Sequence, residues 1–88
     1  MEYPVVDLST PVIMPNTMVA FKGNTETVIV DVTHLVNLWR RIDRAPDGGS
    51  NQIFMIKTLR MMRSADGTSQ ISLRLAKDIT EWIKKRYL

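Results

Sequence analysis

The sequence contains no cysteine and a single histidine, His34. The absence of cysteine excludes disulfides, thiolate ligands for zinc and cysteine nucleophiles. A histidine that binds a metal or activates a nucleophile needs further ligands or an orienting acid, and Asp31 is the only acidic residue within one helical turn of it. We therefore expect His34 to lie on the surface, and we predict a protein without a catalytic residue, a metal site or a cofactor.

Long apolar runs are also absent. No apolar segment approaches the roughly 20 residues that a membrane-spanning helix requires. Residues 1–4 include a glutamate and lack the basic and apolar regions of a secretory signal. We expect a soluble chain that is neither secreted nor bound to a membrane.

The 88 residues are enough for one small domain. Three of the four prolines fall near its start: Pro4, Pro11 and Pro15. No helix can run through them, and short β-prone pieces lie between them. We predict an extended arm over residues 1–17, which either lies on its own domain or is held by a neighbouring subunit. Residues 18–88 are then the compact domain.

The clearest local pattern predicts a β-hairpin over residues 18–30. A β-prone segment precedes Lys22-Gly23-Asn24, and a segment rich in β-branched residues follows it. Glycine and asparagine tolerate the positive φ values that tight hairpin turns need.

A first helix is predicted directly after the hairpin, with Asp31 or Thr33 as its N-cap. Apolar residues follow at helical spacing and form one stripe: Val32, Leu35, Val36, Trp39 and Ile42. This helix ends at Ala45-Pro46-Asp47-Gly48-Gly49. A glycine pair before a helix can bind an anion, but we interpret Gly48-Gly49 as a plain loop between two helices.

Two further helices complete the prediction, one over residues 51–64 and one from Ser69 or Ser72 to Tyr87. The fold class is then α+β, with an N-terminal extended arm and β-hairpin followed by a three-helix C-terminal part. One alternative stays open. Residues 71–75 alternate strictly between apolar and polar, so residues 56–63 and 69–75 could instead form a second hairpin.

The net charge of +3 hides an unequal distribution. Residues 1–31 carry one base and four acids, whereas residues 32–88 carry 11 bases and five acids. The bases of the first two predicted helices and their ends are Arg40, Arg41, Arg44, Lys57, Arg60 and Arg63. If these faces align they can neutralise several phosphates, which would suit a small nucleic-acid-binding or regulatory module. The competing interpretation is that these bases lie on exposed helix faces and contact only solvent.

The second predicted helix is apolar over a wide arc, which is more than so small a domain should cover by itself. We predict that part of this helix, together with apolar residues of the arm, contacts another subunit. The predicted protein interface consists of Val5, Val12, Ile13, Phe54, Met55, Met61 and Met62. The alternative is one packed core in which the methionines fill irregular gaps.

The order of hairpin, capped helix and further helices is similar to that of small phage proteins of virion and tail-assembly type. The residues that prompt the comparison are Phe21-Lys22-Gly23-Asn24, Val28-Ile29-Val30-Asp31-Val32, Val36, Trp39 and Ile42. This resemblance implies a non-enzymatic structural or assembly subunit that is present in many copies, in a virion or in the host cytoplasm. Its expected partners are copies of itself or other subunits, not a small-molecule substrate, and the nucleic-acid-binding module remains the alternative.

Overall fold

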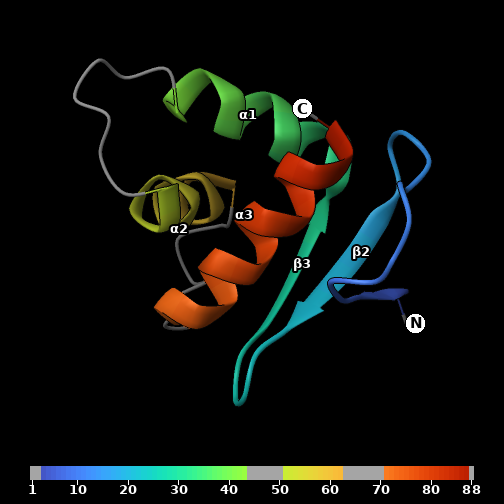
Figure 1. Ribbon diagram of the computed structural model, residues 1–88, viewed down its shortest axis with the longest axis horizontal. Coiled ribbons are helices and arrows are strands. Elements are labelled where there is room, and N and C mark those ends of the chain that lie inside the picture. The colour runs from blue at the N-terminus through green and yellow to red at the C-terminus, as the bar shows by residue number, and fades with distance from the viewer. Residues whose placement is uncertain (1–2, 44–50, 63–70, 88) are drawn as a thin grey trace.

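A computed structural model describes residues 3–43, 51–62 and 71–87 (Figure 1). In chain order these residues form the strands β1 (Val5–Val6), β2 (Met18–Lys22) and β3 (Thr27–Asp31). The helices α1 (Val32–Asp43), α2 (Asn51–Met62) and α3 (Leu73–Tyr87) follow. The predicted α+β class is confirmed, with the strands first in the chain and the helices after them.

The predicted hairpin is formed by β2 and β3. The strands are antiparallel, with Val19 opposite Val30 and Phe21 opposite Val28. These four side chains are buried, while the residues between them point to the other face of the sheet. The turn of the hairpin extends beyond the helices at one end of the molecule (Figure 1).

The third strand, β1, was not predicted. It pairs in parallel with β2, so that Val5 lies beside Ala20 and Val6 beside Phe21. The Ala20 N–H donates to the Pro4 carbonyl at 2.8 Å. The strand order is β1-β2-β3. A strand of two residues is too short to show an alternating pattern, and its partner lies far away in the sequence.

Helix α1 begins where the sequence predicted. The Asp31 carboxylate accepts a hydrogen bond from the backbone N–H of His34 at 3.1 Å, which makes Asp31 the N-cap. Thr33, the other candidate, has a different role: its hydroxyl accepts from the N–H of Asn16 at 2.8 Å. The described part of the predicted apolar stripe is buried: Val32, Leu35, Val36 and Trp39.

Helix α3 also has a capping residue. The Ser72 hydroxyl accepts from the Leu75 N–H at 3.1 Å, and the Ser72 carbonyl accepts from the Ala76 N–H at 3.0 Å. The second candidate for this start, Ser69, lies outside the described residues.

The alternative of a second hairpin is wrong for the part of it that the structure describes, because residues 56–62 and 73–75 are helical. The alternating pattern has another cause. Ile71 is buried just before α3, Leu73 is exposed in its first turn, and Leu75 is buried against the core.

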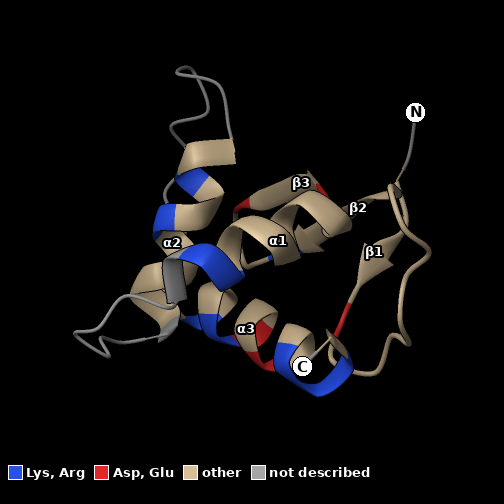
Figure 2. Cartoon of the chain, turned by 90° about the horizontal axis from the view of Figure 1, so that it is seen from above, with Lys and Arg blue, Asp and Glu red and all other residues tan. Residues whose placement is uncertain are grey.

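The helices cover one face of the sheet. α1 packs against β3 and α3 packs against β2, while α2 packs against both of these helices (Figures 1 and 2). Trp39 and Trp82 are the largest fully buried side chains of the core between these layers. Their indole groups differ, because Trp82 donates a hydrogen bond and Trp39 has no partner among the described residues.

Candidate contact surfaces

The arm, residues 3–17, lies on its own domain. The Thr10 carbonyl accepts hydrogen bonds from the Trp82 indole N–H at 2.7 Å and from the Arg86 guanidinium. Arg86 also donates to the Leu8 carbonyl at 2.8 Å. The last two turns of α3 therefore bind the main chain of the arm directly.

A second anchor lies further along the arm. The Tyr87 hydroxyl accepts from the Ile13 N–H at 3.0 Å and lies 3.3 Å from the Ile13 carbonyl. The Tyr87 ring also packs on Trp82, at a centroid distance of 5.5 Å. Of the two alternatives that the sequence left open for the arm, the structure shows the first, in which the chain holds its own arm.

Asp7 turns the arm sharply after β1. Its carboxylate accepts from the Ser9 N–H at 2.8 Å, from the Ser9 hydroxyl at 2.6 Å and from the Thr10 hydroxyl at 3.3 Å. These hydrogen bonds, those of Ser9 foremost, lower the pKa of Asp7 below its ordinary value. The turn directs the chain back towards α3.

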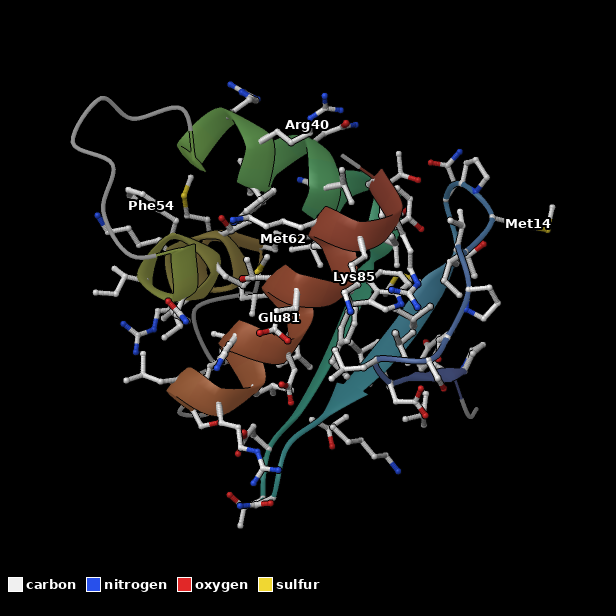
Figure 3. The ribbon with its side chains drawn as sticks, viewed as in Figure 1. Met14, Arg40, Phe54, Met62, Glu81 and Lys85 are labelled. Carbon is white, nitrogen blue, oxygen red and sulfur yellow. The ribbon has the colours of Figure 1, made fainter. Side chains whose placement is uncertain are left out.

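The predicted interface residues of the arm differ in exposure. Val5 and Val12 are 51% and 58% exposed, whereas Ile13 is half-buried and packs against the core. Met14, which was not predicted, is 78% exposed and points away from the helices (Figure 3). An exposed apolar surface is therefore present on the arm, but it faces outward from a docked segment.

The predicted interface residues of α2 divide in the same way. Phe54 and Met55 are both buried, and Met55 belongs to the core that α2 shares with the other helices. Met62 is half-buried against the core, and Met61 is exposed. The wide apolar arc of α2 is explained largely by its position against both α1 and α3.

No helix among the described residues covers the outer face of the sheet. Val5, Ala20 and Ile29 lie side by side across its three strands and share this face. Val5 and Ile29 are 51% and 44% exposed, and Met18 on the same face is 40% exposed, whereas Ala20 between them is buried. An apolar row therefore crosses the sheet on the side opposite the helices.

The edge of β3 that faces away from β2 is open among the described residues. The Gly23 N–H donates to the Glu26 carbonyl at 2.8 Å, which makes these two residues a hydrogen-bonded pair of the hairpin. Since such pairs alternate along an antiparallel ladder, Val28 and Val30 direct their main-chain groups to β2, and Thr27 and Ile29 direct theirs to the open edge. The bond from Ala20 to the arm agrees with this alternation, because Ala20 is opposite Ile29 and points away from it.

A groove lies between the arm, β2 and α3. It has a volume of about 420 Å³, and its floor is formed by apolar residues, Phe21, Leu75, Ile79 and Trp82 among them. Asp7, Asp78 and Lys22 lie at its rim. The floor residues are themselves almost completely buried. The groove is therefore a shallow depression that suits a small apolar group next to a charge.

The basic residues lie on the helical side of the molecule. Arg40, Arg41, Lys57 and Arg60, four of the predicted nucleic-acid-binding residues, are exposed on the neighbouring helices α1 and α2 (Figure 2). Arg44 and Arg63 lie outside the described residues. α3 adds further exposed bases at both of its ends: Arg74, Lys77, Lys84 and Lys85.

The described residues contain no group of three His, Asp or Glu side chains that could hold a metal ion. His34 is exposed in the first turn of α1, where its backbone N–H is bound by the N-cap. None of the helices in residues 3–43, 51–62 and 71–87 is long and apolar enough to cross a membrane.

Comparison with known proteins gives no match: no family model, no curated protein and no solved structure resembles the chain. The contacts that the chain makes must therefore be inferred from its geometry.

Proposed function

We propose that this protein is a non-enzymatic structural or assembly subunit and that it acts through protein–protein contacts on the sheet side of its domain. We propose a phage virion or tail as the assembly, because the order of hairpin, capped helix and further helices in the sequence is similar to that of small proteins of that kind.

The main support is the apolar row on the outer face of the sheet. Val5, Met18 and Ile29 are each at least 40% exposed there, on the face of the sheet opposite the helices. Several exposed apolar residues on one side of a small protein are typical of an interaction site. The open edge of β3 borders the same face, so main-chain and side-chain contacts are available together.

The docked arm changes how the contact is made. The sequence suggested an arm laid across a neighbouring copy, but Trp82, Arg86 and Tyr87 hold it on its own chain. We therefore propose that the surface is presented by a preformed domain, so that binding does not require a segment to become ordered.

Two measurements on the purified protein test this proposal together. Light scattering gives the native mass, which we expect to exceed the 10.1 kDa of one chain. Binding of a hydrophobic dye reports exposed apolar surface and should fall when Val5 and Ile29 are both replaced by threonine. A monodisperse monomer that binds no dye contradicts the proposal.

A second candidate function, nucleic-acid binding, is favoured by the distribution of charge. The three helices carry nine Lys and Arg against three Asp and Glu, and the sheet side carries few bases. Arg40→Glu with Arg41→Glu should then abolish retardation of DNA or RNA in a gel at low salt, and binding should weaken steeply as salt rises. Val5→Glu on the opposite side is the matched control. Absence of any retardation by the unmodified protein excludes this candidate.

A further inference from the structure

We infer that the open edge of β3 pairs with the same edge of a second copy, and that the two antiparallel strands meet at Ile29. This inference rests on the proposed function and names the partner for one part of the sheet side. It follows from three properties of the edge: its main-chain groups, its composition and its register.

The main-chain groups come first. Thr27 and Ile29 direct both N–H and C=O away from β2, and Asp31 directs its N–H the same way. The Asp31 carbonyl is used in the chain itself, because the carbonyl of an N-cap residue accepts the first hydrogen bond of its helix. None of the outward groups has a hydrogen-bond partner among the described residues. A strand added to this edge would satisfy them.

The composition of the edge is the second property. Natural proteins protect open edges with lysine, proline, bulges or very short strands, which prevent pairing with another chain. β3 has the sequence Thr-Val-Ile-Val-Asp over residues 27–31, five residues that pair without a break along β2. It carries none of these protective features. The opposite edge has two of them, since β1 is only two residues long and follows Pro4.

The register follows from matching the outward groups. If Ile29 is opposite Ile29 of the second copy, Thr27 is opposite Asp31, and each outward residue of one β3 strand is paired with an outward residue of the other. The two Ile29 residues exchange a pair of hydrogen bonds, and each Asp31 N–H reaches the Thr27 carbonyl of the other copy. In this register only the Thr27 N–H stays without a partner. A shift of two residues towards Asp31 loses two of the four hydrogen bonds, and a shift of four places the two Asp31 carboxylates opposite each other, where like charges repel. A shift of two residues towards Thr27 keeps four hydrogen bonds but gives up the pairing of Thr27 with Asp31.

The side chains agree with this register. Thr27, Ile29 and Asp31 share the outer face, so a Thr27 hydroxyl can donate to the Asp31 carboxylate of the other copy. The apolar row of Val5, Ala20 and Ile29 continues into the same row of the second copy. The product is one six-stranded sheet with two-fold symmetry, which has a protected β1 at each end.

Charge substitutions at Ile29 give the decisive experiment. Ile29 is 44% exposed, so Ile29→Lys and Ile29→Glu should each fold, which circular dichroism can verify. In the inferred register each change places two like charges directly opposite each other. We expect the dissociation constant of the dimer to rise by roughly tenfold or more in each variant. An equimolar mixture of the two variants should restore a dimer, because lysine then faces glutamate.

Ile53→Lys is the matched control, since it makes the same exchange at an exposed position of α2, on the helical side of the molecule, and should leave the dimer unchanged. Hydrogen exchange gives a second readout: the amides of Ile29 and Asp31 should exchange slowly in the dimer and fast in Ile29→Lys. A strand pair of this length buries less than the roughly 1,200–2,000 Å² of a standard interface, so the mass should be measured over a concentration series.

Each outcome is decisive for one of the two proposals. An oligomer whose mass is unaffected by both charge variants, or a mixture that fails to pair, overturns the inference and leaves the assembly function standing. A monomer that binds the hydrophobic dye also overturns the inference, because the exposed surface then serves a different partner. A monomer without dye binding overturns both.

Discussion

The two edges of the three-stranded sheet differ in how well they are protected against pairing with another chain. At one edge, β1 has two residues, follows a proline and continues into an arm that α3 binds through Trp82, Arg86 and Tyr87. At the other edge, β3 pairs over five residues, contains no proline or lysine and leaves outward main-chain groups without partners among the described residues. One small sheet therefore has a protected edge and an unprotected edge, and this difference supports our inference that the unprotected edge pairs with a second copy.

The largest expected effect comes from removing the protection of the first edge. Deletion of residues 1–16 removes β1 and the arm, and it exposes parts of the Trp82 and Phe21 side chains to water. We expect a loss of at least about 4 kcal/mol in the free energy of unfolding, from several hydrogen bonds and the burial of Val6 and Ile13.

Denaturant unfolding measures this loss, and the shortened chain should also form larger species, because both edges of its sheet are then open. Val12→Ser, at an exposed position of the arm, is the control and should change stability by less than about 0.5 kcal/mol. An unchanged unfolding midpoint after the deletion would show that the arm does not stabilise the domain.

The two tryptophans give the next effect. Trp82→Phe leaves the Thr10 carbonyl without its indole donor, whereas Trp39→Phe removes an N–H that has no partner among the described residues. Both changes remove a similar volume from the core. We therefore expect Trp82→Phe to destabilise the protein by about 1 kcal/mol more than Trp39→Phe in thermal or denaturant unfolding. Equal losses would mean that the bond to the arm contributes nothing.

A smaller effect is expected at the guanidinium that binds the arm. Arg86→Met retains much of the packing on Trp82 but removes the hydrogen bonds to the Leu8 and Thr10 carbonyls. We expect a loss of about 1–2 kcal/mol and faster hydrogen exchange within the arm. Lys85→Met, the exposed neighbour, is the matched control (Figure 3). If both variants exchange alike, Arg86 is not an anchor.

The smallest effect lies at the turn between β2 and β3. The Ser72 hydroxyl donates to the Glu26 carboxylate at 2.9 Å and is the main cause of a lowered pKa of Glu26. The stabilisation from this group is therefore present above its ordinary pKa and is lost as the pH falls through the lowered value. In the Glu26→Gln variant the free energy of unfolding should therefore fall less steeply as the pH is lowered.

Gly23→Ala should act in the same direction, because a Cβ at Gly23 would overlap the Glu26 carboxyl group and displace it. The two changes should then not be additive in acid unfolding curves measured on the single and double variants. Full additivity would show that Gly23 and Glu26 act independently.

Local patterns were sufficient to predict much of the fold. The hairpin follows from a glycine turn between β-prone segments, and the starts of α1 and α3 follow from Asp31 and Ser72 as capping residues. Each of these signals acts over a few residues. The helix over residues 73–75, by contrast, was ambiguous, since alternation over five residues fits a strand as well as a helix that starts at a cap.

The remaining features depend on residues that are far apart in the sequence. β1 and the docked arm require contacts between the first 17 residues and β2 or α3, including the pair of Thr10 and Trp82. The position of Phe54 and Met55 depends on how α2 packs between its neighbours, so an apolar helix surface was assigned to a partner that the chain itself supplies. The open edge at Ile29 has a signal in the sequence, because the segment 27–31 contains no lysine or proline.

The anchoring of the arm by α3 also has a consequence for biosynthesis. Synthesis proceeds from the N-terminus, so residues 3–17 leave the ribosome long before Trp82, Arg86 and Tyr87 exist. The hairpin can form early, but its β1 side must wait for the last helix, and contacts so distant in sequence slow folding. During that interval both sides of the nascent hairpin are unprotected, which makes the completion of α3 the step that leaves a single edge able to pair.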